Sequence, residues 1–312
     1  MPDRIVLEQE NQIRKLINNP QKHYKLRQDK ALFYQLCSSL DIIEDTEDAI
    51  AAYTEEDFGQ DKSLLYLAVY GLLQAIYVQQ DAVINLCEAL GIKDDIHNYP
   101  KLNEIREIRN DTAGHPTKRD RKKGKPNSYH HISHITLNKS GFTLASYFSD
   151  GSNAQFRDIK TSELIIEQRK FISSILTTLI NGLEAEEKAH KEKFRMEKLI
   201  EIFPETLGYD FEKLFEGISR DEYAELANNN LKNIMDVVNK FRDSVKRRNM
   251  DFYERLQDDF ELIEYAAANL GKYFHGRNGV ENLAAQIYAY FLQNKVDALK
   301  EYAKIIDDEY AK

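Results

Sequence analysis

The stretch DKSLLYLAVYGLLQAIYVQQDAVINLCEALG, Asp61 to Gly91, decides the fold of this chain. Its apolar residues recur every three or four positions, which is the spacing of one face of an α-helix. They are Leu64, Leu65, Ala68, Leu72, Ala75, Ile76, Val83, Leu86, Cys87 and Leu90. Gly91 follows the last of them and suits the left-handed position that often closes a helix. The pattern predicts one helix from Asp61 to Leu90, whose broad apolar face marks it as the central helix of a bundle.

The segments on either side of this helix share its periodicity. They predict helices at about residues 3–19, 24–40 and 42–53 before it and at 100–112 after it. Pro20 ends the first of these, and Pro100 suits the first turn of the last. We therefore expect an up-and-down helical bundle.

Between the predicted bundle helices and a later long helix, the apolar period changes from 3.6 to 2. Residues 131–137 and 142–148 alternate in polarity and flank the short sequence Asn138 to Gly141. This arrangement predicts a β-hairpin with a short glycine-containing turn. The insertion is thus either this hairpin alone or, with a third short strand near 154–159, a small three-stranded sheet beside the bundle.

The rest of the chain is predicted to be helical. A long helix at 162–202 is apolar in its first half and strongly charged from Glu184 to Lys198. Ser219 to Glu222 has the pattern of a capping box for the next helix, and further helices are expected at 250–275, 279–294 and 295–311. The predicted fold class is thus mainly α. Residues 1–202 form a bundle with a β-hairpin insertion near 129–159, and residues 203–312 form a second, all-helical domain.

The segment RNDTAGH, residues 109–115, lies at the C-terminal end of the helix expected at 100–112. Gly114 suits a left-handed helix cap, and Pro116 excludes His115 from the α region. His115 is then expected just past the last helical carbonyls, where the helix dipole favours an imidazolium. A permanent cation, an amide and a titratable imidazole meet at this helix end, a combination that can do acid–base work on a phosphodiester.

This segment resembles the Arg-x4-6-His signature of HEPN domains, in the form in which Asn, Asp or His follows the arginine. The resemblance covers residues 24–200 at most, and its specific part is seven residues long. HEPN domains are small α-helical bundles, and many are metal-independent endoribonucleases of toxin–antitoxin, CRISPR and phage-defence systems. The resemblance implies an HEPN-like endoribonuclease without cofactors, acting on RNA in a toxin or antiviral defence system. It also implies a homodimer with two copies of the motif facing one cleft, and an antitoxin or another defence protein as a further partner.

The same resemblance implies roles for the motif residues. His115 would be the general base or acid for the ribose 2′-OH or the leaving 5′-oxygen, and Arg109 would stabilise the phosphorane. Asn110 would orient the pair by hydrogen bonding. Thr117 stands where some family toxins carry the tyrosine of a His-x-Tyr motif, so regulation by tyrosine modification is not implied.

A basic segment follows the motif directly. Its cations are Lys118, Arg119, Arg121, Lys122, Lys123 and Lys125. The formal net charge of −9 excludes a general nucleic-acid coat, so any RNA contact must be local. Two interpretations stay open: the segment draws the RNA backbone toward Arg109 and His115, or it is only a solvated loop.

The competing hypothesis is a noncatalytic helical interaction module or nucleotide-binding module. In that case Arg109 would pair with Asp111 or Glu107, and His115 would only cap a helix. The C-terminal helices would serve for assembly, sensing or restraint of the nuclease under the first hypothesis.

No metal site is expected from the sequence. His130, His131 and His134 lie close together, but strand alternation places at most two of them on one face, so a polar sheet face open to RNA is favoured over a metal site. Cys37 and Cys87 both fall within helical patterns and are expected to be core residues. No apolar run is long enough to cross a bilayer, and the N-terminus leads into a polar helix, so we expect a soluble, cytoplasmic protein.

Overall fold

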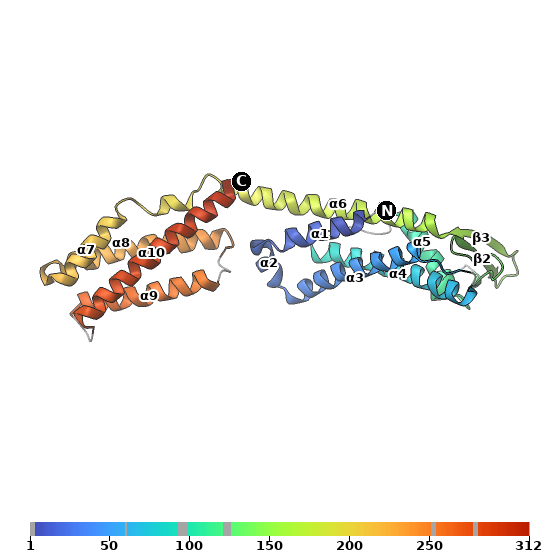
Figure 1. Ribbon diagram of the computed structural model, residues 1–312, viewed down its shortest axis with the longest axis horizontal. Helices are drawn as coiled ribbons and strands as arrows, with labels where there is room; N and C mark the ends of the chain where they lie inside the picture. Colours follow the sequence, from blue (N-terminus) through green and yellow to red (C-terminus); the bar gives the residue numbers. More distant parts are fainter. Residues whose placement is uncertain are drawn as a thin grey trace. The chain divides into compact units, whose positions relative to one another are not determined.

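The computed structural model describes residues 4–59, 61–92, 99–120, 126–250, 254–276 and 280–311. It is mainly helical, at 75% helix, with one three-stranded antiparallel sheet, which confirms the predicted coarse fold class. The chain divides into two compact units, Met1–Glu184 and Ala185–Lys312 (Figure 1). The helices of the first unit are α1 (Ile5–Ile17), α2 (Pro20–Arg27), α3 (Lys30–Glu55), α4 (Lys62–Ala89), α5 (Pro100–Arg109) and the first part of α6 (Thr161–Phe194).

Helix α4 begins and ends as the sequence predicts. Asp61 caps its N-terminus by accepting hydrogen bonds from the backbone N–H groups of Ser63 and Leu64. At the other end Gly91 has a φ of +72°, and the backbone N–H of Ile92 donates to the carbonyl of Cys87 at 2.8 Å. This is the Schellman arrangement, in which a left-handed glycine lets the chain satisfy the last helical carbonyls.

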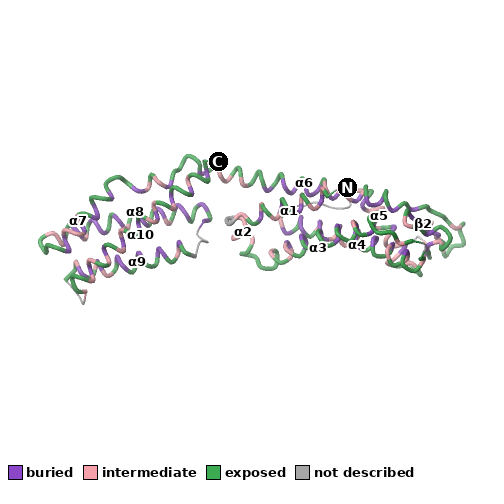
Figure 2. Tube along the Cα trace, viewed as in Figure 1, coloured by how far each residue is buried: buried purple, intermediate pink, exposed green. Residues whose placement is uncertain are grey.

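The apolar face of α4 lies in the core of the first unit. Its buried residues pack with those of α1, α3, α5 and α6 in one hydrophobic core, and the buried segments are purple in Figure 2. A chain of buried polar side chains crosses this core. The Arg169 guanidinium lies 2.8 Å from Glu47, Gln79 donates to Glu47 at 2.8 Å, and Gln168 donates to Gln79 at 2.9 Å. Gln80 in turn donates to Gln168 at 2.7 Å, which links α3, α4 and α6.

The sheet consists of β1 (Ser128–Ile132), β2 (Gly141–Phe148) and β3 (Gln155–Lys160) in that order. Its apolar side chains, among them Phe142, Leu144 and Ile159, join the core of the helices. The third strand and the site of insertion are as predicted. The first strand is earlier than the predicted 131–137, because β1 pairs His130 with Ser146 and the chain turns after Ile132.

Several predicted helix boundaries are wrong. Residues 24–40 and 42–53 were expected as two helices, but α3 runs unbroken from Lys30 to Glu55, because buried Leu40 and Ile43 continue one apolar face. The helices expected at 279–294 and 295–311 likewise form one helix, α10 (Asn282–Ala311). Helix α2 begins at Pro20, which occupies its first turn instead of only ending α1.

The second unit begins before the predicted boundary at residue 203. Helix α6 ends at Phe194, and this residue already belongs to the second core, so the units divide at Glu184 within the helix. The remaining helices are α7 (Leu207–Ser219), α8 (Ala224–Arg247) and α9 (Glu254–Phe274), together with α10. The predicted capping box is absent, because Ser219 is the last residue of α7 and its hydroxyl donates to the Phe215 carbonyl. Within the described residues no helix has the length and apolar character needed to span a membrane.

Candidate functional site

The motif lies where α5 changes its helical winding. The α-helix ends at Arg109, and Asn110–Gly114 form a π-helical turn in which the His115 N–H donates to the Asn110 carbonyl at 2.7 Å. His115 leaves the helix with φ −137° and ψ 52°, as Pro116 requires, and is exposed. Single π-turns inside helices often occur at functional sites, because the extra residue reorients the side chains around it.

Arg109 is held against α4. Its Nη2 donates to the side-chain oxygen of Gln74 at 2.8 Å, and its guanidinium lies 4.1 Å from the centre of the Tyr77 ring. Its Nη1 donates to the Asn110 side chain at 3.0 Å. Asn110 thus contributes to the orientation of the guanidinium. Two hydrogen-bonded amides and an aromatic face fix the cation without neutralising its charge.

Gly114 is not the left-handed cap that the sequence suggested. It is absent from the residues with positive φ in the described part of the chain, because the π-turn carries the helix on to this position. Its lack of a side chain serves another purpose: a Cβ atom here would lie 2.8 Å from Nη1 of Arg109. The guanidinium therefore packs against residue 114, directly before His115 in the chain.

The carboxylates expected as alternative partners of Arg109 bind another residue. Glu107 and Asp111 both form ion pairs with Arg119, whose side chain is 15% exposed. Burial lowers the pKa of Arg119, but the hydrogen bonds to these two carboxylates outweigh burial and keep the pKa above its ordinary value. Arg119 therefore has a structural role, since it links Glu107 and Asp111. It could bind RNA only after it leaves both carboxylates.

Of the other predicted RNA-binding residues, the structure describes only Lys118. Lys118 is exposed, and its ammonium nitrogen lies 3.5 Å from a carboxylate oxygen of Asp120. Arg121, Lys122, Lys123 and Lys125 lie outside the described residues.

The three neighbouring histidines have separate surroundings. His130 is buried between Ser128 and Ser146, whereas His131 is exposed and stacks on Tyr147. His134 follows β1 and stacks on Tyr66 of α4. Among the described residues, no group of three potential metal ligands comes together.

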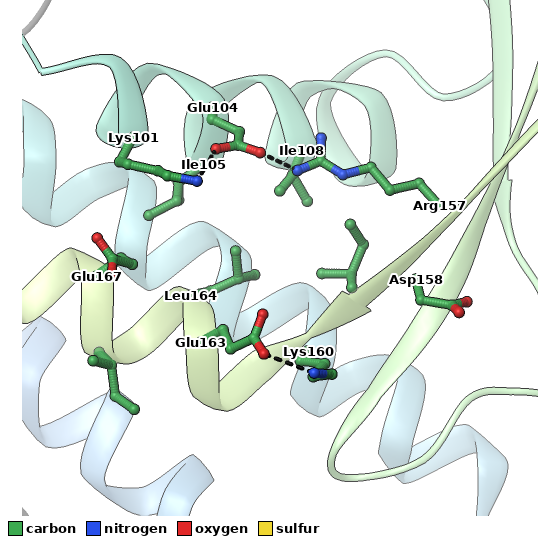
Figure 3. Close-up of a pocket in the computed structure, with 12 residues that line it drawn as sticks. Lys101, Glu104, Ile105, Ile108, Arg157, Asp158, Lys160, Glu163, Leu164 and Glu167 are labelled. Atoms are coloured by element: carbon green, nitrogen blue, oxygen red, sulfur yellow. Dashed lines mark hydrogen bonds and ion pairs between the residues drawn. The ribbon is translucent and has the colours of Figure 1, made fainter.

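A pocket of about 260 Å³ lies on another side of α5, between this helix, β3 and the start of α6 (Figure 3). Ile105 and Ile108 belong to its lining, but neither Arg109 nor His115 does. Glu104 accepts hydrogen bonds from Lys101 and Arg157, as the dashed lines of Figure 3 show. The bond from Lys101 and the charge of Arg157 hold the pKa of Glu104 below its ordinary value. Since these cations already have a carboxylate partner, the pocket is poorly suited to a nucleotide phosphate.

The sequence alone did not indicate that Gln74 and Tyr77 contact Arg109, or that His130 contacts Asp111. Gln74 and Tyr77 lie three positions apart on α4, a spacing that places them on one helix face. That spacing was visible, but only the packing of α5 against α4 shows that they hold Arg109. The polar sheet face expected at the three histidines does not include the His130 side chain, which is buried and contacts serine hydroxyls and Asp111.

We expect Thr112→Val to stabilise the first unit by about 1 kcal/mol, because the hydroxyl of Thr112 is buried in the π-turn without a hydrogen-bond partner among the described residues. Valine has nearly the same shape and removes the unsatisfied group. Hydrogen exchange of amides in α4 and α5 would report the change in unfolding free energy. A loss of stability would mean that the hydroxyl has a partner, such as an ordered water.

Comparison with known proteins found no match to this chain among protein-family models, curated proteins or solved structures.

Proposed function

We propose that the protein is a metal-independent endoribonuclease of the HEPN type, acting as a cytoplasmic toxin or in antiviral defence. The observation that carries the proposal is the placement of the motif. Arg109 is oriented by Gln74, Tyr77 and Asn110, and His115 lies exposed immediately beyond the turn against which that guanidinium packs. A fixed cation and an accessible imidazole are the two groups that phosphodiester transesterification needs at a minimum.

The reaction follows from these two groups. An imidazole of His115 removes the proton of a ribose 2′-OH as its oxygen attacks the adjacent phosphorus, or donates a proton to the 5′-oxygen as it leaves. Arg109 binds the non-bridging oxygens, whose negative charge grows in the phosphorane. The products are a 2′,3′-cyclic phosphate and a 5′-hydroxyl.

A homodimer is part of this proposal. On α4, Leu64, Leu67, Gly71 and Gln74 follow one another on one helix face. The two leucines are 48% and 70% exposed, and Gly71 has open space where a Cβ would lie. An apolar helix face with a glycine allows another helix to approach closely, and this face leads directly to Gln74, the residue that holds Arg109. Pairing of two copies through it would bring their motifs together.

Incubation of the purified protein with labelled RNA in EDTA tests the activity. We expect cleavage to persist under chelation and to leave 2′,3′-cyclic phosphate ends, because the proposed chemistry uses only imidazole and guanidinium groups. Treatment of the products with acid or a phosphatase identifies the cyclic end group. Loss of cleavage in EDTA and its return with a divalent ion would contradict the mechanism.

We expect Leu67→Glu to weaken the dimer by at least about 30-fold, since a buried interface anchor contributes about 2 kcal/mol or more. Light scattering or sedimentation over a concentration series measures the dissociation constant. The matched control is Ile166→Glu on α6, where an isoleucine that is 63% exposed lines the pocket of Figure 3 and is not part of the α4 face. Equal dissociation constants for the two variants, or a monomeric parent protein, would contradict pairing through α4.

The competing hypothesis of a helical interaction module also has one observation in its favour. Leu283, Ile287 and Tyr290 follow one another on α10, and each is at least 60% exposed. We propose that this unit serves assembly, sensing or restraint of the nuclease, with an antitoxin or defence protein as a partner. If the protein does not cleave RNA at all, the exposed apolar faces of α4 and α10 are better explained by an interaction module than by a nuclease.

A further inference from the structure

His130 of β1 is a buried titratable side chain that the proposed reaction does not use. Its imidazole is 1% exposed, and its Nε2 lies 3.2 Å from a carboxylate oxygen of Asp111 in the π-turn. The same nitrogen lies 2.9 Å from the Ser128 hydroxyl, and Nδ1 lies 2.8 Å from the Ser146 hydroxyl. Both ring nitrogens therefore have partners, and these come from three separate segments of the chain.

These contacts fix the orientation of the ring. An ionised carboxylate only accepts hydrogen bonds, so the nearby Asp111 favours a proton on Nε2 of His130. The Ser146 hydroxyl can donate to Nδ1 or accept from it, so this contact is satisfied in either protonation state of the ring. Because β1 and β2 pair His130 directly with Ser146, the sheet itself holds the ring in this position.

The backbone of His130 makes a second contact with the motif. Its N–H donates to the Pro116 carbonyl at 2.7 Å. Arg119 also pairs with Ser128 through backbone hydrogen bonds in both directions, at 2.9 and 3.2 Å. The segment after the motif is thus attached to the edge of β1.

We propose that His130 is a positioning residue for His115. Its side chain anchors the π-turn at Asp111, its backbone anchors the chain at Pro116, and His115 lies between these two anchors. Arg119 forms an ion pair with the same carboxylate oxygen of Asp111. Loss of the His130 imidazole removes one of these two side-chain contacts, so the turn on the N-terminal side of His115 is held less firmly and the catalytic imidazole is less well fixed in its productive orientation.

The kinetic test rests on the proposed ribonuclease function. We expect His130→Ala to lower kcat for RNA cleavage by about ten- to a hundredfold, because a small misplacement of a catalytic group costs that much. KM should stay within about twofold, since His130 is buried and touches no substrate. His130→Gln retains an N–H group that can reach toward Asp111 and should recover part of kcat. The matched control is His131→Ala on the same strand, where the ring is exposed and stacks only on Tyr147 in the described structure.

A second measurement does not depend on activity. Hydrogen exchange should quicken at the amides of residues 111–115 in His130→Ala, while exchange in the α4 core stays at the rate of the parent protein. Asp111→Asn weakens the same contact, together with the ion pair to Arg119, without removing a buried ring, and it replaces His130→Ala if that variant does not fold.

The two measurements separate the two proposals. Quickened exchange with no RNA cleavage by the parent protein supports the positioning role and refutes the ribonuclease function. Normal exchange at 111–115 in the variants, or a kcat within twofold of the parent value, overturns the role of His130. A rise in KM without a change in kcat would overturn it as well, because that result indicates an RNA-binding residue.

Discussion

His115→Ala is expected to reduce RNA cleavage by at least about a hundredfold, because a general acid or base typically contributes 10²- to 10⁴-fold to the rate. The fold should be unaffected, since His115 is an exposed residue at the end of the π-turn. Single-turnover rates at saturating RNA measure the chemical step directly. Circular dichroism and the dimer dissociation constant show whether the variant remains intact.

Arg109→Ala should cause a loss of similar size, and Arg109→Lys should restore little of it. Lysine keeps the charge, but it cannot reproduce the planar guanidinium that binds Gln74 and stacks on Tyr77. Full recovery in Arg109→Lys would reduce the role of Arg109 to that of a simple positive charge.

The matched control for both variants is His275→Ala. This histidine is also exposed and also follows the end of a helix, α9, but it has no arginine four to six residues before it. We expect the control to cleave RNA at the parent rate. If His115→Ala does so as well, the motif has only a structural role and the ribonuclease proposal fails.

Arg169→Met is expected to destabilise the first unit by about 3–5 kcal/mol, the largest stability effect we predict. Arg169 forms an ion pair with Glu47, whose side chain is 2% exposed in the centre of the helical core. Removal of the arginine leaves a buried carboxylate whose charge is uncompensated. Hydrogen exchange of the α4 core amides measures the unfolding of this unit separately from that of the other.

A second substitution tests whether the buried charge is the cause. Glu47→Gln in the Arg169→Met background removes the charge but keeps an acceptor for Gln79, which donates to Glu47 at 2.8 Å. More than half of the lost stability should return, because a neutral amide costs far less to bury than a carboxylate. An unchanged stability in the double variant would assign the loss to packing of the arginine side chain.

The helices were the most predictable part of the structure. Helix α4 could be predicted at both ends because its signals are local: Asp61 caps its own first turn, and Gly91 adopts the left-handed conformation directly after the last turn. Boundaries without such a signal were placed wrongly. Residues 40–43 looked like a break between two helices, yet burial of Leu40 and Ile43 in one core keeps α3 continuous.

The candidate site was predictable in its residues but not in its geometry. The sequence alone determined that Arg109, Asn110 and His115 lie at a helix end and that Pro116 keeps His115 out of the helix. Only the tertiary structure decided how they are held. A π-turn replaces the expected glycine cap, and Gln74 and Tyr77 of α4 bind the guanidinium.

The physical reason is the range of the interactions. Helix caps and apolar periodicity involve residues only a few positions apart, so they can be recognised in the local sequence. Arg109 and Gln74 are 35 positions apart, and the contact of His130 with Asp111 joins a strand to a helical turn. Such contacts form only after helices and sheet have packed, and packing therefore decided the orientation of a motif that the sequence could only locate.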